Sequence, residues 1–330
     1  MGLISHESLT IWCNNYFAPT QRTEQALLRE GIGEHRLMMN DSRQDGATGD
    51  AERALLDADI AFGAPDPETV MRAEKLRWIQ LNSAGYTAYD RDDFRRALAS
   101  RGAIMTNSSA VYDEPCAQHL LAMMLSLARG LPDSLEAQRS TRMWRMEDIR
   151  LNSRLLNGQT VVLLGFGAIA QRLVELLATF GMNIIGVRRR VSGNEPVRVV
   201  READVDHYLP LADHVVNTLP ANTGTANFID ARRLARLKPG AILYNIGRGT
   251  TVDQDALLRR LEDGQLAAAY LDVTDPEPLP PDHPLWAEPH CYITPHTAGG
   301  HADEKERQVN HFLENLHRYL NGAELVNRII

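Results

Sequence analysis

The stretch Gly165-Phe166-Gly167-Ala168-Ile169-Ala170 decides the fold, because it fits G-x-G-x-x-G/A and lies between an apolar run at 161–164 and a helical pattern at 168–180. In such a turn the first glycine allows the tight bend, the second lets backbone approach a pyrophosphate, and a small third residue lets the helix pack on the strand. The N–H groups that open the helix then point at the phosphates. We therefore interpret Gly165, Gly167, Ala168 and Ile169 as part of a dinucleotide-binding loop.

The second strand of this unit, predicted at 182–187, ends in Arg188-Arg189-Arg190, where an acid usually accepts the ribose hydroxyls of NAD. An acid at this position would repel a 2′-phosphate, whereas an arginine fork holds phosphate oxygens well. Arg188 lies 21 residues after Gly167 and is our first candidate for reading the phosphate, with Arg189 second. The pattern favours NADP, and NAD stays possible if the arginines form only a solvated basic turn.

Apolar runs alternate with helical patterns on both sides of the loop, which predicts an α/β fold with two Rossmann-like lobes, each a doubly wound parallel sheet, and a cleft between the lobes. Helices are predicted at 24–30 and 168–180, with Gly181 as a helix-ending glycine and Asp253 as a helix cap. Strands are predicted at 9–13, 36–39, 60–63, 76–81, 161–164, 182–187, 215–219, 241–246, 267–272 and 291–294.

A polar stretch at 106–109 predicts the domain boundary. We expect residues 1–106, joined by a helix within 300–330, to form a flavodoxin-like substrate-binding domain, and residues 107–299 to form the dinucleotide-binding Rossmann domain. Asp113 is a candidate cap for a helix that reaches Arg129 and has apolar residues at i, i+3, i+4, i+7 spacing. Its long apolar face predicts a homodimer.

Charge and cysteine spacing exclude several classes of protein. The chain of 330 residues has a formal net charge of -8, which argues against binding to nucleic acid or to anionic membranes. Cys13, Cys116 and Cys291 lack the spacing of a disulfide framework or zinc site, which predicts reduced thiols in a cytoplasmic protein. The first ten residues do not look like a signal peptide, and no apolar run approaches the roughly 18 residues of a membrane span.

Two other chemistries are also disfavoured. No G-x-S-x-G elbow is present, which argues against a serine hydrolase. His296, His301, Asp303 and Glu304 match no strong metal-ligand pattern, so we expect no metal site.

Three stretches at predicted strand ends carry the remaining chemistry, at the edge where open α/β sheets bind ligands. Taken singly, each has an ordinary explanation as a surface cation, a solvated acidic loop or a histidine in a turn. The stretches are 244–249 with Arg248 between two glycines, 271–278 with Asp272 and Glu277, and 294–300 with His296.

Together and in this order, the three stretches resemble those of the D-isomer-specific 2-hydroxyacid dehydrogenases, a family that includes glyoxylate/hydroxypyruvate reductases. The runs 58–63, 76–80, 83–85 and 282–286 are similar to further landmarks of that family, so the resemblance covers nearly the whole chain. It implies an NAD(P)-dependent oxidoreductase that reduces a small 2-keto acid, of the glyoxylate or hydroxypyruvate kind, to the D-2-hydroxy acid.

The resemblance also implies roles for individual residues. Arg248 would hold the substrate carboxylate and carbonyl, while His296 would exchange a proton with the substrate oxygen and pair with Glu277. The backbone N–H groups of Ala84 and Gly85 would also hold the carboxylate. Asp272 would contact the nicotinamide carboxamide, and the other cofactor contacts that we expect at or after strand ends are Leu219, Pro220, Thr225 and Ile246.

Some residues depart from the family pattern. Ala117-Gln118-His119 stands where the family usually has Ala-Glu-His, and Ala170 replaces the third glycine, but neither change removes a catalytic group. The formate-oxidising branch has glutamine where Glu277 stands, which disfavours formate as the substrate. One alternative stays open, a dinucleotide-sensing protein similar to the C-terminal-binding corepressors; the absence of extra tails and the apparent NADP preference count against it.

Overall fold

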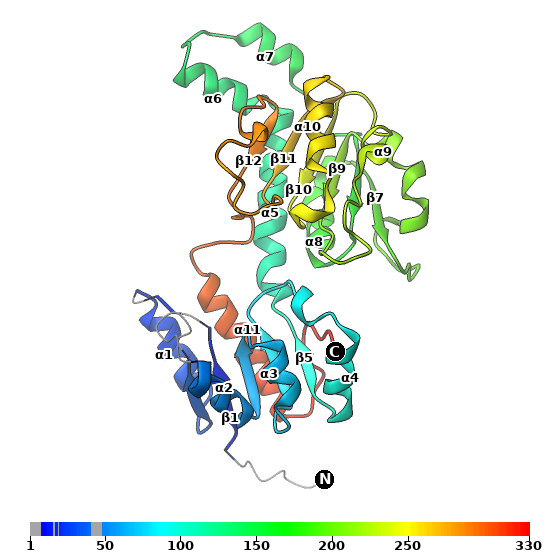
Figure 1. Ribbon diagram of the computed structural model, residues 1–330. Helices are drawn as coiled ribbons and strands as arrows, with labels where there is room; N and C mark the ends of the chain where they lie inside the picture. The colour runs from blue at the N-terminus through cyan, green and yellow to red at the C-terminus, as the bar shows by residue number, and fades with distance from the viewer. Residues whose placement is uncertain (1–7, 16, 19, 41–47) are drawn as a thin grey trace. The chain divides into compact units, whose positions relative to one another are not determined.

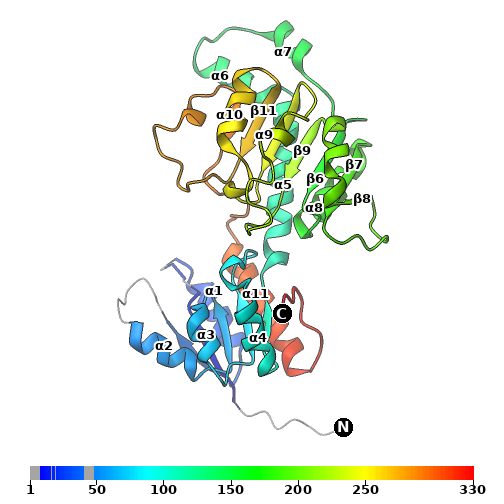
Figure 2. The ribbon, with the colours of Figure 1, turned by 45° about the vertical axis from the view of Figure 1, so that its right-hand side comes forward.

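The computed structural model describes residues 8–15, 17, 18, 20–40 and 48–330, which fall into two compact units (Figures 1 and 2). Unit 1 comprises the described residues up to Tyr112 together with His301–Ile330, and unit 2 comprises Asp113–Gly300. The first border lies inside the long helix α5 (Ser109–Ala128). The sequence analysis set the borders after residues 106 and 299.

Unit 1 is built on a five-stranded parallel sheet with the order β2-β1-β3-β4-β5, which is the doubly wound order of flavodoxin-like folds. Phe312 of the C-terminal helix stacks on Phe62 and Trp78 at centroid distances of 4.4 and 5.3 Å, so this helix completes the core of unit 1. The strands are β1 (Thr10–Cys13), β2 (Arg36–Met39), β3 (Ile60–Gly63), β4 (Trp78–Leu81) and β5 (Ile104–Thr106), and the helices are α1 (Arg22–Gly31), α2 (Thr48–Leu56), α3 (Pro67–Arg72), α4 (Asp92–Ser100) and α11 (Glu304–Leu320).

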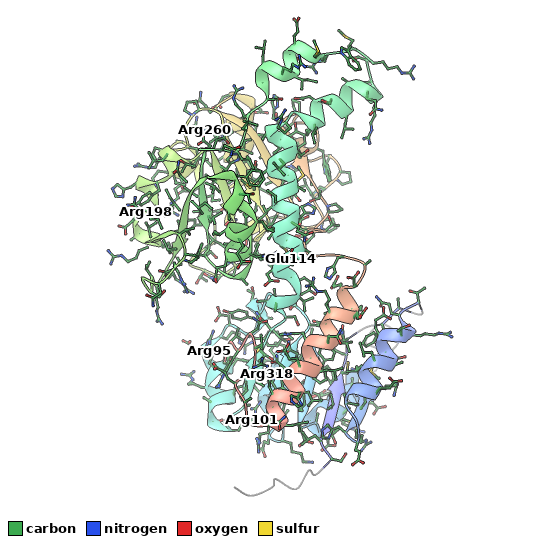
Figure 3. The ribbon with its side chains drawn as sticks, turned by 180° about the vertical axis from the view of Figure 1, so that it is seen from behind. Arg95, Arg101, Glu114, Arg198, Arg260 and Arg318 are labelled. Carbon is green, nitrogen blue, oxygen red and sulfur yellow. The ribbon has the colours of Figure 1, made fainter. Side chains whose placement is uncertain are left out.

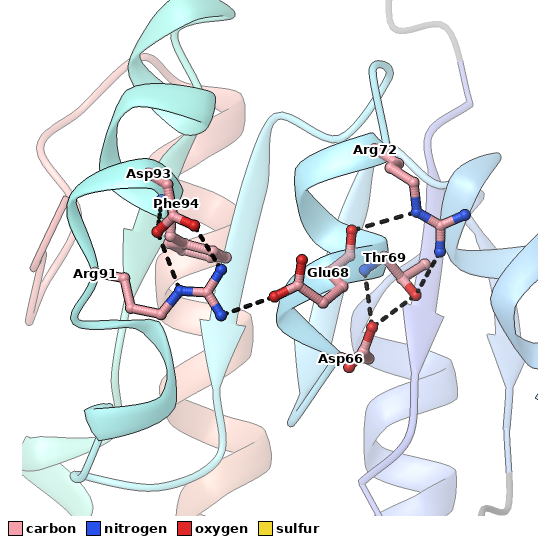
Figure 4. A network of polar contacts seen from close by, with 7 residues as sticks. All are labelled: Asp66, Glu68, Thr69, Arg72, Arg91, Asp93 and Phe94. Atoms are coloured by element: carbon pink, nitrogen blue, oxygen red, sulfur yellow. Dashed lines mark hydrogen bonds and ion pairs between the residues drawn. The ribbon is translucent and has the colours of Figure 1, made fainter.

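A polar network fixes the first turns of α3 and α4 (Figure 4). Asp66 caps α3 by accepting hydrogen bonds from Thr69 N and Thr69 Oγ1, both at 2.8 Å. Arg91, just before α4, pairs with Asp93 and Glu68 at 2.7 Å. These ion pairs are exposed, so each contributes little to stability.

Unit 2 is built on a seven-stranded parallel sheet with the order β12-β11-β10-β9-β6-β7-β8. Numbered within the unit, this is the Rossmann order 3-2-1-4-5-6 with a seventh strand at the edge. The predicted α/β class with two parallel sheets is confirmed. The strands are β6 (Thr160–Leu164), β7 (Asn183–Arg188), β8 (Arg198–Arg201), β9 (His214–Asn217), β10 (Ala241–Asn245), β11 (Leu266–Leu271) and β12 (Cys291–Ile293).

Helix ends in unit 2 follow local capping chemistry. The side chain of Asp253 accepts a hydrogen bond from Ala256 N at 2.9 Å, which confirms the predicted cap. The predicted cap at Asp113 is wrong, because α5 begins at Ser109 and Asp113 lies inside it. The side chains of Asn107 and Asn327 accept from the first N–H groups of α5 instead. The remaining helices are α6 (Leu131–Arg139), α7 (Met146–Asn152), α8 (Ala168–Leu177), α9 (Ala231–Leu234) and α10 (Gln254–Glu262).

The two faces of the unit 2 sheet receive alternate side chains. Ala269 and Leu271 of β11 pack in a core cluster with Leu257 of α10, whereas Tyr270 between them contacts His119 of α5 on the other face. An ion pair between Arg172 and Glu114 ties α8 to α5; Figure 3 shows Glu114 on α5. Within the described ranges, no helix combines the length and apolar character needed to cross a membrane.

Candidate active site

The glycine loop between β6 and α8 has open space at the position where a phosphate would approach. Gly165 has φ +88°, and a Cβ there would lie 3.0 Å from Thr218 Oγ1, so the tight turn requires glycine. A Cβ built on Gly167 would meet no atom within 4 Å, and no side chain caps α8. The loop lies between β6 and β9, where the strand order reverses, which is where nucleotides bind in such sheets.

The loops that follow β9 and β10 lie at the same edge of the sheet as the glycine loop. The Cβ position of Gly165 lies 3.3 Å from Leu219 N, and Ile246 N donates to Asn217 O at 3.1 Å. The hydroxyl of Thr225 turns back and donates to Pro220 O at 2.6 Å, which closes the loop after β9. Leu219 and Ile246 follow their strands instead of ending them, because β9 and β10 stop at asparagines.

The basic end of β7 is partly neutralised by an acid of its own loop. Arg188 is the last residue of β7, and its Nη1 lies 3.7 Å from Glu195 Oε1. Hydrogen bonds from the N–H and hydroxyl of Ser192 lower the pKa of Glu195 to about 2, so this acid is a carboxylate at working pH. Arg201 of β8 is in register with Arg188 and adds a second cation, whereas Arg189 is exposed in the loop.

The loop that carries Arg248 needs its two glycines for close backbone packing. A Cβ on Gly249 would lie 1.9 Å from the carbonyl oxygen of Thr274, and a Cβ on Gly247 would lie 2.6 Å from Leu219 O. The Arg248 loop is therefore in direct backbone contact with the loop after β11. The glycines serve this contact, which the sequence pattern of an arginine between two glycines does not reveal.

Buried polar side chains hold the Arg248 backbone in place. The carbonyl oxygen of Arg248 accepts from Thr251 Oγ1 at 2.6 Å and from Asn245 Nδ2 at 3.1 Å. Asn217 Nδ2 donates to both Asn245 Oδ1 and Thr251 Oγ1. The Arg248 guanidinium itself donates to Gly247 O at 2.7 Å, and within the described chain it makes no ion pair.

His296 and Glu277 form a pair at the end of the sheet. His296 Nδ1 lies 2.5 Å from Glu277 Oε1, and the two side chains are 49% and 42% exposed. Because a carboxylate can only accept, Nδ1 carries the proton of this bond. His296 Nε2 is then the ring nitrogen that can exchange a proton with a ligand or with solvent.

Asp272 holds the turn that presents His296. The main chain of His296 has φ +52°, a conformation that residues other than glycine seldom adopt. His296 N donates to Asp272 O at 2.9 Å, and the Asp272 carboxylate accepts from Thr297 N at 2.8 Å and from Ala298 N at 3.0 Å. Asp272 is only 3% exposed, so these bonds are protected from water.

Comparison with known proteins places this site in a family. A family model described as "D-isomer specific 2-hydroxyacid dehydrogenase, NAD binding domain" matches residues 121–298. The chain belongs to the D-isomer specific 2-hydroxyacid dehydrogenases. Glyoxylate/hydroxypyruvate reductase B of Pectobacterium carotovorum subsp. carotovorum (strain PC1) is 32% identical over 263 residues, which cover 79% of this chain and 81% of the relative.

Solved structures of the family agree over nearly the whole chain. A D-isomer specific 2-hydroxyacid dehydrogenase family protein from Aeromonas salmonicida subsp. salmonicida A449 has a TM-score of 0.76 at 29% identity and covers 98% of this chain and 99% of its own. A D-isomer specific 2-hydroxyacid dehydrogenase from Xanthobacter autotrophicus Py2, in complex with NADPH and MES, has a TM-score of 0.80 at 25% identity and covers 98% of both chains. The predicted family is confirmed, and the chain is an oxidoreductase with a nicotinamide dinucleotide cofactor.

The residues of this 2-hydroxyacid dehydrogenase fit such a cofactor. The open space at Gly167 and the uncapped start of α8 leave room and N–H donors for a pyrophosphate. The Asp272 carboxylate offers about four acceptor positions. Three of these are taken by Thr294 Oγ1, Thr297 N and Ala298 N, and the fourth can receive a carboxamide N–H.

Sequence reasoning missed several polar residues of this dehydrogenase site. Asn217 and Asn245 end buried strands, and an asparagine that closes an apolar run was the available signal. Tyr270 interrupts the run Ala267-Ala268-Ala269 on β11, and its hydroxyl contacts both His119 and Thr294. Ala84 and Gly85 lie in unit 1, where Asn107 Nδ2 and Ser83 Oγ donate to their carbonyl oxygens and fix the loop.

Proposed function

We propose that this enzyme reduces a small 2-keto acid of the glyoxylate or hydroxypyruvate kind to the D-2-hydroxy acid. The observation that carries the proposal is the His296–Glu277 pair, which lies at the same sheet edge as the glycine loop and leaves Nε2 as the exchangeable nitrogen. The glyoxylate/hydroxypyruvate reductase among its relatives supports the substrate class. We assign unit 2 to dinucleotide binding and unit 1, with Ala84 and Gly85 as carboxylate donors, to substrate binding.

Each residue of the proposed site has a separate task. When bound, a reduced nicotinamide would supply a hydride to the keto carbon. His296 gives the proton on Nε2 to the keto oxygen, while Glu277 stabilises the charged ring through Nδ1. Arg248 donates to the substrate carboxylate and to the oxygen that gains negative charge. After turnover His296 recovers a proton from water, to which its side chain is half exposed.

A panel of 2-keto acids, assayed with NADPH and with NADH, tests this function. We expect turnover of glyoxylate or hydroxypyruvate, and the panel also ranks longer keto acids. If the protein binds NADPH but turns over no keto acid, the dinucleotide-sensing alternative takes the place of this proposal.

We propose NADP as the preferred cofactor. Arg188 ends β7 at the position that reads the adenosine ribose, and Arg201 lies beside it in register. Three donors of this loop, Ser192 N, Ser192 Oγ and Gly193 N, bond to the carboxylate of Glu195 at 2.7 to 2.8 Å, which supports the proposal that the loop can accommodate an anion beside Arg188. A 2′-phosphate would replace that carboxylate beside Arg188.

Replacing Arg188 with alanine should therefore lower the ratio of kcat/KM for NADPH to that for NADH by about ten- to a hundredfold, since a charge-assisted bond is worth about 1.5 to 3 kcal/mol. Glu195→Gln should raise the same ratio, because the competing carboxylate is removed. Arg190→Ala, an exposed neighbour, is the matched control and should leave the ratio within twofold. Salt is held constant because exposed phosphate contacts are screened. A wild type that prefers NADH, or an unchanged ratio in Arg188→Ala, contradicts the assignment.

We also propose that the enzyme is a homodimer of the cytoplasm. Its three cysteines are free thiols, which suits a reducing compartment. Helices α6 and α7 project from unit 2 (Figures 1 and 2), and seven of the ten exposed large hydrophobic side chains in the described chain lie on or beside them. Apolar patches of this kind mark protein interfaces. The seven are Leu131, Leu135, Met143, Trp144, Met146, Leu151 and Leu155.

Light scattering at micromolar concentration should give twice the chain mass of 36.8 kDa. The double variant Trp144→Asp/Leu151→Asp places two charges on the exposed patch and should give the monomer mass. Leu211→Asp is the control, because Leu211 is 54% exposed and lies outside this patch. A monomeric wild type, or a variant that remains dimeric, refutes the dimer contact.

A further inference from the structure

A continuous line of hydrogen bonds crosses one face of the unit 2 sheet and ends at Asp272. It begins at His119 of α5, whose Nε2 lies 2.5 Å from the hydroxyl of Tyr270. That hydroxyl lies 2.6 Å from Thr294 Oγ1, which donates to Asp272 Oδ1 at 2.6 Å. The line reaches the site because β11 and β12 are parallel neighbours, so Thr294 and Asp272 emerge side by side.

The Asp272 carboxylate sets the direction of every bond in the line. A carboxylate only accepts hydrogen bonds, so Thr294 uses its single O–H to donate to Asp272 and must accept from Tyr270. The Tyr270 hydroxyl then donates its hydrogen bond to Thr294 and accepts one from the Nε2–H group of His119. Burial raises the pKa of Tyr270, which keeps its hydroxyl protonated for this task.

The far end of the line is the turn of His296. The Asp272 carboxylate that accepts the Thr294 hydrogen bond also accepts hydrogen bonds from Thr297 N and Ala298 N, the two N–H groups that follow His296. These bonds hold His296 at φ +52°. Without the Tyr270 hydroxyl, the Thr294 hydroxyl can turn its O–H away from Asp272. The carboxylate then keeps only its two backbone donors, and the turn is held less firmly.

We propose that Tyr270 is a positioning residue for the proton donor His296, and that His119 orients the Tyr270 hydroxyl. The inference rests on the proposed function of His296. It adds two residues that touch neither the substrate oxygen nor the carboxylate-binding Arg248. Their effect passes through Thr294 and Asp272 to the position of the His296 ring.

The same sheet contains a second buried tyrosine–histidine pair, whose hydrogen bonds run away from the site. Tyr244 of β10 is in register with Tyr270, and both rings are fully buried. The Tyr244 hydroxyl lies 3.1 Å from His214 Nδ1, and His214 Nε2 lies 2.5 Å from Gln159 Oε1. His214 opens β9 and Gln159 precedes β6, so this line ends at the opposite edge of the sheet.

The decisive comparison is Tyr270→Phe against Tyr244→Phe. Each variant removes one hydroxyl from a buried ring and breaks one tyrosine–histidine bond. Tyr270→Phe also breaks the bond to Thr294, so the unfolding midpoint should fall in both variants and further in Tyr270→Phe. Tyr270→Phe should also lower kcat about three- to tenfold with KM for the keto acid unchanged, as one lost hydrogen bond allows. The isotope effect with 4-deuterated reduced cofactor should rise, because chemistry becomes slower than the other steps. Tyr244→Phe should keep kcat within twofold.

Coupling and exchange measurements complete the test. Adding His119→Ala to Tyr270→Phe should cause no further loss in kcat, because both act through one line. Amide hydrogen exchange of the segment 294–300 should be faster in Tyr270→Phe than in Tyr244→Phe, a readout that needs no activity. Equal kcat and equal exchange in the two tyrosine variants overturn the inference. A wild type that turns over no keto acid overturns the proposed function instead, and exchange still decides the role of Tyr270.

Discussion

His296→Ala should lower kcat for keto acid reduction by about 10²- to 10⁴-fold, the range for loss of a general acid. The ring is half exposed and, among the described residues, makes its hydrogen bond only to Glu277, so its removal should leave the fold intact. His290→Ala is the matched control, because this exposed histidine lies just before the same strand, β12, at its other end. Steady-state kinetics with saturating cofactor measures the effect. If kcat of His296→Ala lies within tenfold of the wild-type value, His296 is not the general acid.

Glu277→Gln extends this prediction to the partner of His296. Glutamine keeps an oxygen that accepts from Nδ1 but loses the negative charge that favours the protonated ring. Since reduction uses the protonated ring, the alkaline limb of the kcat/KM profile should move to lower pH. The loss at neutral pH should then be smaller than in His296→Ala and should recover on mild acidification. An unmoved limb argues against the pairing.

Arg248→Ala is expected to have the second largest effect, with kcat about 10²- to 10³-fold lower and a raised KM for the keto acid. The substrate oxygen would lose its charged donor, and the carboxylate would lose its bidentate partner. The loop should survive the change, because Asn245 and Thr251 hold the Arg248 carbonyl and not its side chain.

Two further arginine variants sharpen the test. Arg248→Lys keeps the charge without the planar fork, so it should recover only part of the lost rate. Arg260→Ala, on α10 (Figure 3), removes an arginine that pairs with Asp263 and should leave kcat within twofold. If Arg248→Ala changes neither kcat nor KM, the substrate carboxylate is bound elsewhere.

Local chemistry made much of the fold predictable. The first glycine of 165–170, the cap at Asp253 and the glycine after the α8 segment at Gly181 each satisfy a backbone requirement that depends on neighbouring residues alone. Asp113 failed for the converse reason. Its competitor Asn327 lies more than two hundred residues away in the chain, and no local pattern reports such a contact.

The candidate site was predictable as a set of residues but not as a set of contacts. The motifs indicated His296 and Glu277, and the structure brings them together. The pairing of Arg188 with Glu195 depends on how an irregular loop folds back, which periodicity does not describe. From the sequence, Tyr270 is one more buried aromatic residue in an apolar strand. Only the structure places its hydroxyl beside His119.

The backbone contact between Gly249 and Thr274 limits how this enzyme can be redesigned or can diverge. Both partners are main chain, so no compensating side chain elsewhere can make room for a larger residue at 249. The segments 247–249 and 272–278 therefore constrain each other, although they lie on different loops. A chimera intended to accept a different acid should take both segments from the same parent, since mixing parents would join backbones that were never selected to meet.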